Sequence, residues 1–280
     1  MSGGRSLVAG ANAMFRASES RRPPSSRILD DPFARRFEER DLRVLAVRAA
    51  RHLLPPLRRL LAELQTVHCV RHRAIDELVL RAVDEGFRQV VVVGAGYDMR
   101  PSRFAARLAG VRWLEADHPA TAARKRALLE RAGDAALPVE RVAVDLAGQS
   151  LGDALSATAF DASAPACFVL EGLVHYLAPE RLDALLGDVA RGPGRRRAVL
   201  SFIRTDMYER APGLFVRLVK LVREIPRLHF APDALAAILA RHGLAAFRSW
   251  TLAQQIEDFA PAAHGRAAGV SQDVAVATSA

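Results

Sequence analysis

Two glycines and an acidic residue stand where apolar runs of the chain end, and their types suit the binding of a nucleoside. Gly94 and Gly96 follow a continuous β-branched run, and a turn without Cβ atoms lets the backbone come close to a ligand. Asp117 ends the next apolar run, where a carboxylate can accept hydrogen bonds from both ribose hydroxyls of NAD or of S-adenosylmethionine (SAM). Met99 stands in place of the third glycine of a dinucleotide fingerprint, which argues against a pyrophosphate site. A tight strand-to-helix turn is the structural alternative for the glycines, and Glu115 is the alternative to Asp117.

A second group of chemically active side chains follows the next two apolar runs. Asp145 and Leu146 could offer a polar contact to an adenine amino group and an apolar wall for its ring, although an aspartate there also suits an ordinary turn. Glu171 stands where the amino group and sulfonium of SAM would lie, and since a buried carboxylate without a cationic partner is costly, its position suggests a ligand. His175, with Tyr176 beside it, is an acceptor contact or a general base, or else a loop histidine bonded to the backbone.

The elements that must position these residues alternate between strand and helix. Five predicted strands, each followed by a helical pattern, indicate a parallel sheet with right-handed crossovers, in which ligands bind at the carboxyl ends of the strands. The last two predicted strands have no helix-length amphipathic segment between them, so they can pair antiparallel, as in SAM methyltransferases and unlike dinucleotide dehydrogenases. The sequence therefore predicts an α/β fold with a Rossmann-like sheet, mostly parallel and ending in an antiparallel hairpin. The predicted strands are 88–96, 111–117, 139–146, 165–173, 196–203, 245–252 and 273–280.

The chain before the first strand is predicted to be helical. Residues 7–65 are expected to form helices, the last of which ends at Pro55 and Pro56. Apolar residues at helical spacing predict a further helix over 66–85. We therefore expect an N-terminal helical cap or lid (1–65) and a Rossmann-like core (66–280) with a second cap insertion at about 204–230.

Composition narrows the classes of partner. The net charge of +9 and pI of 10.7 come almost entirely from arginines spread among acids, with no interleaved aromatics, so we expect no nucleic-acid partner. Cys69 and Cys167 stand alone, which argues against a structural zinc and a disulfide framework. No apolar run approaches the roughly 18 residues of a membrane span. We expect a soluble, cytoplasmic protein without membrane contact, whose positive surface favours an anionic small-molecule acceptor.

Four stretches of the chain resemble, in order and spacing, the leucine carboxyl methyltransferase-like family, which includes bacterial polyketide O-methyltransferases. They are RASESRRPPSSRILDDPFARRF, RHRAIDELVLRAVDEGFRQVVVVGAGYDMR, WLEADHPATAARKRALL and LEGLVHYLAPERLDALL. The resemblance implies a class I SAM-dependent methyltransferase, from which this chain departs at Met99, usually threonine, and at His175, more often apolar. The implied cofactor contacts are Arg73 with the SAM carboxylate, Gly94 and Gly96 with its methionine part, Asp117 with the ribose, Asp145 and Leu146 with adenine, and Glu171 with the amino group.

The expected reaction is O-methylation of a carboxylate on a polyketide-like or other small acid. A carboxylate is a nucleophile without a base, whereas a hydroxyl acceptor needs one, for which His175 is the candidate. Arg204 is expected to steer an anionic acceptor, with Tyr176, Tyr208 and His229 as further contacts. The alternatives are an NAD-type oxidoreductase, a protein or tRNA carboxyl methyltransferase, and a catalytically silent SAM-binding partner.

Overall fold

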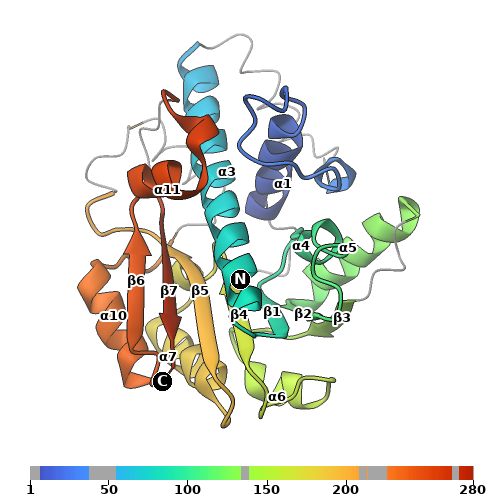
Figure 1. Cartoon of the computed structure of the whole chain (residues 1–280), viewed down its shortest axis with the longest axis vertical. Coiled ribbons are helices and arrows are strands. Elements are labelled where there is room, and N and C mark those ends of the chain that lie inside the picture. The colour runs from blue at the N-terminus through green and yellow to red at the C-terminus, as the bar shows by residue number, and fades with distance from the viewer. Residues whose placement is uncertain are drawn as a thin grey trace.

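The fold is built on one mixed sheet, shown in Figure 1 by a computed structural model that describes residues 7–37, 55–133, 139–207, 213, 226–266 and 271–279. Within these residues the sheet has seven strands in the order β3-β2-β1-β4-β5-β7-β6. The first five strands are parallel, and β7 is antiparallel to both β5 and β6, which confirms the predicted sheet and its antiparallel end. The strands are β1 (Gln89–Val93), β2 (Arg112–Asp117), β3 (Val139–Ala143), β4 (Ala166–Leu170), β5 (Arg196–Phe202), β6 (Ala246–Trp250) and β7 (Asp273–Thr278).

Helices cover both faces of the sheet because its central strands are apolar on both sides. Val90 and Val92 of β1 pack towards α3 and α11, whereas Val91 and Val93 pack towards α6, α7 and α10. The parallel strands therefore present their carboxyl ends along one edge, between the two helical layers. The helices of these layers are α3 (Pro55–Asp84), α11 (Leu252–Phe259), α6 (Leu151–Ser156), α7 (Pro179–Ala190) and α10 (Pro232–Arg241), and α4 (Arg100–Arg103) and α5 (Pro119–Arg131) follow β1 and β2.

Helix α3 is longer than the sequence predicted. It runs unbroken from Pro55 to Asp84, whereas the periodicity placed a helix over 66–85 only. Pro55 and Pro56 begin this helix, because the first turn of a helix has N–H groups that lack intrahelical partners and a proline there loses nothing. The predicted helix that ends at these prolines falls on residues outside the described part of the chain. The expected boundary between cap and core, after residue 65, falls inside this helix.

The connection between β6 and β7 contains a helix that the sequence analysis did not expect. Helix α11 begins after Thr251, whose hydroxyl accepts from the Gln254 N–H while the Gln254 side chain returns to the Thr251 N–H, a capping box. The prediction of a connection without a helix is wrong. The antiparallel pairing of β6 and β7 holds nevertheless, because the connecting segment returns to the same edge of the sheet.

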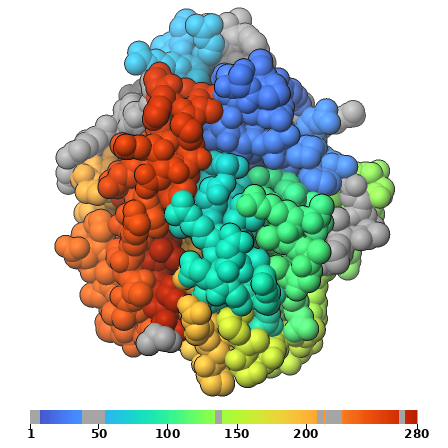
Figure 2. Space-filling view, viewed as in Figure 1, coloured from blue at the N-terminus to red at the C-terminus, as the bar shows by residue number. Residues whose placement is uncertain are grey.

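The N-terminal segment packs on the sheet's helical layer. Helix α1 (Leu7–Glu19) contacts α3, and a 3-10 helix, η1 (Ala34–Phe37), follows it. Figure 2 shows this segment, in blue, lying against the red C-terminal part of the chain, where Arg266 Nη1 donates to Glu19 (2.9 Å). Residues 38–54 of the expected cap and most of the expected insertion 204–230 lie outside the described residues.

Among the helices that the structure describes, none combines the length and the apolar character that crossing a membrane requires.

Candidate functional site

The glycine turn after β1 meets Asp117 at the end of β2. Gly94 and Gly96 have φ of 67° and 49°, and a Cβ on Gly94 would lie 3.1 Å from Cδ1 of Leu173. The Gly96 N–H donates to Oδ2 of Asp117 (2.5 Å), and the His118 N–H donates to Oδ1 (2.6 Å). Burial raises the pKa of Asp117, and the two backbone donors partly oppose that shift. A carboxylate with further acceptor capacity thus lies directly against a turn that requires glycine.

Glu171 follows β4 and has its cationic partners within the protein. Arg71 Nε donates to Oε1 (2.9 Å), and Arg100 Nη2 lies 2.7 Å from Oε2. Burial disfavours ionisation of this carboxyl, but the hydrogen bond with His72 and the charges of Arg100 and Arg71 outweigh burial and hold the pKa of Glu171 well below its usual range. Burial of Glu171 therefore does not by itself call for a ligand, because the protein compensates the charge, and its contact with the cofactor stays a prediction. What remains is an ionised carboxylate beside a guanidinium, a pair that complements a zwitterion.

His72 is the neutral member of this group. Burial and the charge of Arg100 lower its pKa, so the imidazole carries one proton. Arg103 Nη1 lies 3.0 Å from Nε2 and donates to it. Nδ1 lies 3.0 Å from Oε2 of Glu171 and 2.9 Å from Arg100 Nη2, so the ring contacts the carboxylate and both guanidinium groups.

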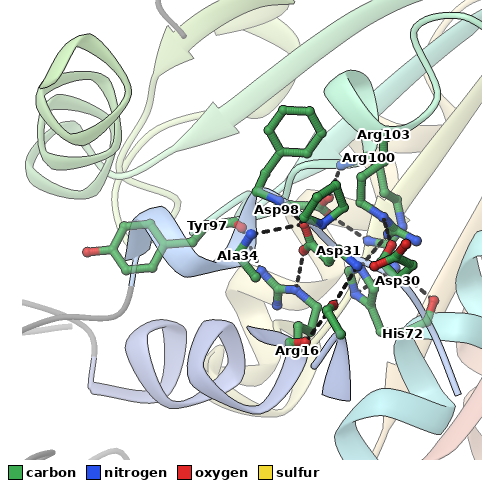
Figure 3. A network of polar contacts seen from close by, with 12 residues as sticks. Arg16, Asp30, Asp31, Ala34, His72, Tyr97, Asp98, Arg100 and Arg103 are labelled. Atoms are coloured by element: carbon green, nitrogen blue, oxygen red, sulfur yellow. Dashed lines mark hydrogen bonds and ion pairs between the residues drawn. The ribbon is translucent and has the colours of Figure 1, made fainter. Parts of the chain in front are cut away.

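Arg100 connects Glu171 to a wider network of buried charges, part of which is drawn in Figure 3. Its Nε donates to Oδ1 of Asp76 (2.7 Å), and its Nη1 donates to Asp98. Arg103 Nη2 reaches the other oxygen of Asp76 (2.5 Å). Guanidinium and carboxylate groups thus alternate from α3 through the glycine turn to the end of β4.

The N-terminal segment closes over the glycine turn. Arg16 of α1 donates from Nε to Oδ2 of buried Asp31 (2.9 Å) and from Nη2 to the Tyr97 carbonyl (2.7 Å), as Figure 3 shows. A Cβ on Gly96 would lie 3.5 Å from Cβ of Ala9. Sequence analysis singled out none of these contacts, although Arg16 and Asp31 lie within the first of the four family-like stretches.

The structure does not bring Arg73 to this edge. Its Nη2 lies 2.6 Å from Oε1 of Glu77 and its Nε donates to the Phe259 carbonyl (3.4 Å), so it faces α11. Residues two positions apart on a helix point in nearly opposite directions. Arg71, which is 3% exposed, therefore takes the place beside Glu171 that the sequence analysis gave to Arg73.

His175 lies in a 3-10 turn, η2 (Val174–Tyr176), four residues beyond Glu171 and 1% exposed. Its carbonyl accepts from the backbone N–H groups of residues 227 (2.6 Å) and 228 (3.1 Å), while its Nδ1 has no hydrogen-bond partner among the described residues. Burial, followed by the charges of Arg71 and His229, lowers the pKa of His175 to about 3. The ring, whose centroid is 4.4 Å from that of Tyr176, is therefore neutral at physiological pH.

Asp145 and Leu146 lie just beyond the end of β3. Oδ1 of Asp145 accepts from the Ala147 N–H (3.0 Å), which is the turn-forming role left open by the sequence. Leu146 is partly buried and packs against the core. The pair thus lies at the same sheet edge as Asp117, with Leu146 as its apolar member.

On the side expected to hold the acceptor, Arg204 lies between two carboxylates. Its Nε is 3.2 Å from Oδ1 of Asp206 and its Nη1 is 3.6 Å from Oδ2 of Asp273. Part of the charge expected to steer an anion is therefore balanced within the protein. His229 lies in the segment that pairs with the chain at Arg204, and burial lowers its pKa. Tyr208 lies outside the described residues.

The described part of the chain thus gathers most of the predicted cofactor residues at the carboxyl edge of the sheet and leaves Arg73 apart. The gathered residues are Gly94, Gly96, Asp117, Asp145, Leu146 and Glu171, with His175 next to them.

Comparison with known proteins identifies the family and the fold to which this chain is similar. The family model for leucine carboxyl methyltransferase matches residues 9–190. A relative from Parafrankia sp. (strain EAN1pec), whose name places it among the SAM-dependent methyltransferases, is 36% identical over 236 residues, which cover 81% of this chain and 70% of the relative. A similarly named protein from Mycobacterium sp. (strain KMS) is 38% identical over 132 residues, 46% of this chain and 42% of that protein. The crystal structure of a DUF574-family protein from Streptomyces avermitilis shares the fold, with a TM-score of 0.66 at 15% identity over 99% of this chain and 98% of that one.

Proposed function

Because this chain belongs to the leucine carboxyl methyltransferase family and is a SAM-dependent methyltransferase, we propose that it methylates a carboxylate oxygen of a small, polyketide-like acid. The family's name refers to a carboxyl acceptor, in keeping with this proposal. Direct support comes from the chain's own residues at the carboxyl edge of the sheet, in two parts: the fit to the cofactor and the nature of the side chains where the acceptor must lie.

The residues present fit SAM. Asp117 is an acceptor for ribose hydroxyls, and the turn at Gly94 and Gly96 leaves no Cβ to obstruct the methionine part. Arg71 and Glu171 would face the carboxylate and the ammonium group of the amino-acid end. When bound, the cofactor supplies a methyl group made electrophilic by its sulfonium. The protein's part is to align that group with the acceptor and to exclude water.

The single observation that carries the carboxylate proposal is the burial of His175, which is 1% exposed in the turn beyond β4 and whose Nδ1 has no hydrogen-bond partner among the described residues. His175 is the imidazole nearest to Glu171 along the chain beyond β4, and its pKa of about 3 makes it a poor base at neutral pH. A hydroxyl acceptor would have to lose its proton to such a group, whereas a carboxylate arrives already ionised. In the proposed step a carboxylate lone pair forms the new C–O bond, the electrons of the old bond remain on sulfur, and no proton is transferred.

The chemistry of the product tests this proposal. We expect the purified enzyme, with SAM labelled in its methyl group and extracts of small acids, to form methyl esters that mild alkali hydrolyses with release of labelled methanol. Ethers stable to alkali as the only products would contradict the carboxylate acceptor and leave the methyltransferase assignment intact.

The cofactor contacts are tested by two neighbouring arginines. We expect Arg71→Met to weaken binding of S-adenosylhomocysteine by about 10- to 100-fold, since a charge-assisted bidentate contact contributes about 1.5–3 kcal/mol. Arg73→Met changes the same residue type two positions along the same helix and should alter the affinity less than twofold. Calorimetric titration of both variants decides the assignment, and the opposite ranking would return the role to Arg73.

A further inference from the structure

A second histidine, His68, lies on the same face of α3 as the residues that bind Glu171. It precedes Arg71 by three positions and His72 by four, and residues at these spacings lie one above another along a helix. Arg71 and His72 both contact Glu171, so His68 lies one turn further towards the start of α3, beyond the carboxyl end of β4. The turn that carries His175 leaves β4 in the same region.

Both imidazoles have a buried nitrogen without a hydrogen-bond partner among the described residues. The atoms are Nδ1 of His68 and Nδ1 of His175. Phe15 of α1 stacks on the His68 ring at a centroid distance of 5.5 Å and fixes its plane, and two backbone hydrogen bonds fix the turn at His175. A buried polar atom left unpaired is unfavourable, and an apolar side chain at either position would avoid that cost.

Burial, reinforced by the charge of Arg71, keeps both rings neutral. Burial and Arg71 lower the pKa of His68 well below its ordinary value, with Glu171 opposing and His175 and Arg16 adding to the effect. Burial lowers the pKa of His175 as well, and the charge of Arg71 adds to the effect. A neutral imidazole offers one N–H donor without adding a positive charge.

We propose that His68 and His175 form a neutral subsite that orients the acceptor carboxylate by donating hydrogen bonds from their Nδ1–H groups. This inference rests on the proposed function, because it takes the acceptor to be a carboxylate. The inference assigns a positioning role to two residues and specifies how they act on the acceptor. Sequence analysis did not single out one of them, His68.

Neutral donors suit this reaction better than a cation. The carboxylate loses its negative charge as the new C–O bond forms, so an arginine bonded to it stabilises the ground state more than the transition state and raises the barrier. An uncharged N–H donor fixes the position of the oxygen and gives up less stabilisation as the charge disappears. Arg71, the nearest cation to these rings in the described site, is already bonded to Glu171.

The experiment uses the complex of the full chain with S-adenosylhomocysteine and benzoate as the carboxylate probe. We expect benzoate to bind this complex, and His68→Leu and His175→Leu each to weaken that binding about 5- to 10-fold, the effect of one lost neutral hydrogen bond of about 1 kcal/mol. His68→Gln and His175→Gln keep an N–H donor and should recover most of the affinity. His242→Gln, at the end of α10 and paired with Asp183, is the matched control and should leave it unchanged.

Two readouts separate this inference from the proposed function. Failure of the wild type to bind S-adenosylhomocysteine would count against the methyltransferase site itself. Binding of S-adenosylhomocysteine with no binding of benzoate, or equal benzoate affinity in the leucine variants, would overturn the subsite alone. Should a leucine variant fail to fold, long-range ¹H–¹⁵N spectra of the wild-type imidazoles decide the matter: benzoate must shift Nδ1 of both His68 and His175, and an unchanged pair of resonances would refute the proposal.

Discussion

Arg100 and Arg196 are both buried, at 0% and 1% exposure, but the protein compensates their charges in different ways. Arg100, near the carboxyl edge of the sheet, meets the carboxylates of Asp76, Asp98 and Glu171. Arg196 is the first residue of β5, at the opposite edge, and among the described residues its guanidinium donates to backbone carbonyls alone, including those of Ala164 (2.9 Å) and Ala162. Burial is outweighed by the carboxylates at Arg100, whose pKa is raised, whereas burial lowers the pKa of Arg196.

The difference follows from what each edge must do. In the proposed function the carboxyl edge presents ionised groups to a zwitterionic cofactor, and its charges are held by other charges in a network that reaches from α3 to Glu171. The amino edge has only to close the turns before β4 and β5, and there one guanidinium binds several backbone carbonyl groups of these turns. Carboxylates compensate the arginine at the carboxyl edge, and backbone carbonyl groups compensate the arginine at the amino edge. We therefore expect the two edges to differ in how substitution and pH change the stability of the fold.

The largest expected effect is at Arg100. We expect Arg100→Met to lower the free energy of unfolding at pH 7 by about 3–5 kcal/mol, because it leaves buried carboxylates unpaired. In the wild type the pKa values of Asp76 and Glu171 are lowered, so these groups stabilise the fold above their ordinary pKa values and the stabilisation is lost as pH falls through the native ones. In the variant the buried carboxylates left without Arg100 bind protons at higher pH than in the wild type, which relieves their cost as pH falls, so the difference from wild type should shrink towards pH 4. Denaturant unfolding at both pH values measures this.

A second substitution keeps this prediction testable if the single variant does not fold. Asp98→Asn removes one of the carboxylates that Arg100 holds, and adding it to Arg100→Met should recover part of the lost stability. A double variant no more stable than the single one would show that the loss at Arg100 is one of packing rather than of charge compensation.

At Arg196 we expect a smaller loss, about 1–3 kcal/mol for Arg196→Met, since carbonyl groups rather than charges lose their partner. The loss should be the same at pH 7 and pH 4, because no carboxylate accepts from Arg196, and the affinity of the folded variant for S-adenosylhomocysteine should be unchanged. Arg195→Met, next to it but exposed, is the matched control and should change stability by no more than about 0.5 kcal/mol. A loss that depended on pH would remove the contrast between the two edges.

The comparison also shows which features a sequence can reveal. The strands and the site at their carboxyl ends were predictable, since a β-branched run such as that before Gly94 fits only a strand buried on both faces, and the ends of parallel strands share one edge. Which arginine of a run is buried was not predictable. Arg196 lies in a run of three arginines that resembles a solvated surface, and only the packed structure selects the middle one for burial.

Helix phase limits the prediction of site residues in the same way. Arg71 and Arg73 have the same chemistry, and the pattern of apolar residues on α3 does not decide which of them faces Glu171, because this helix is buried on more than one side. His68 carried no signal of its own, since one histidine on a largely apolar helix is most often a core residue. Its significance depends on His175, which lies more than a hundred residues away in the sequence.

The smallest effect concerns Asp273, a carboxylate at the carboxyl edge that the charge network does not compensate. It is 1% exposed, neither oxygen has a hydrogen-bond partner among the described residues, and burial raises its pKa to about 6. At pH values below its ordinary pKa of 3.8, Asp273 is protonated in both the folded and the unfolded state, and its burial does not lower stability. Between that pH and about 6 only the unfolded chain ionises, so the stability of the fold decreases as pH rises.

We expect Asp273→Asn to be more stable than wild type by about 1–2 kcal/mol at pH 7.5, after allowance for solvent and for Arg204, and equally stable at pH 4. A variant less stable at pH 7.5 would mean that Arg204 compensates Asp273 as fully as the network compensates Glu171, and thermal unfolding across this pH range distinguishes the two cases.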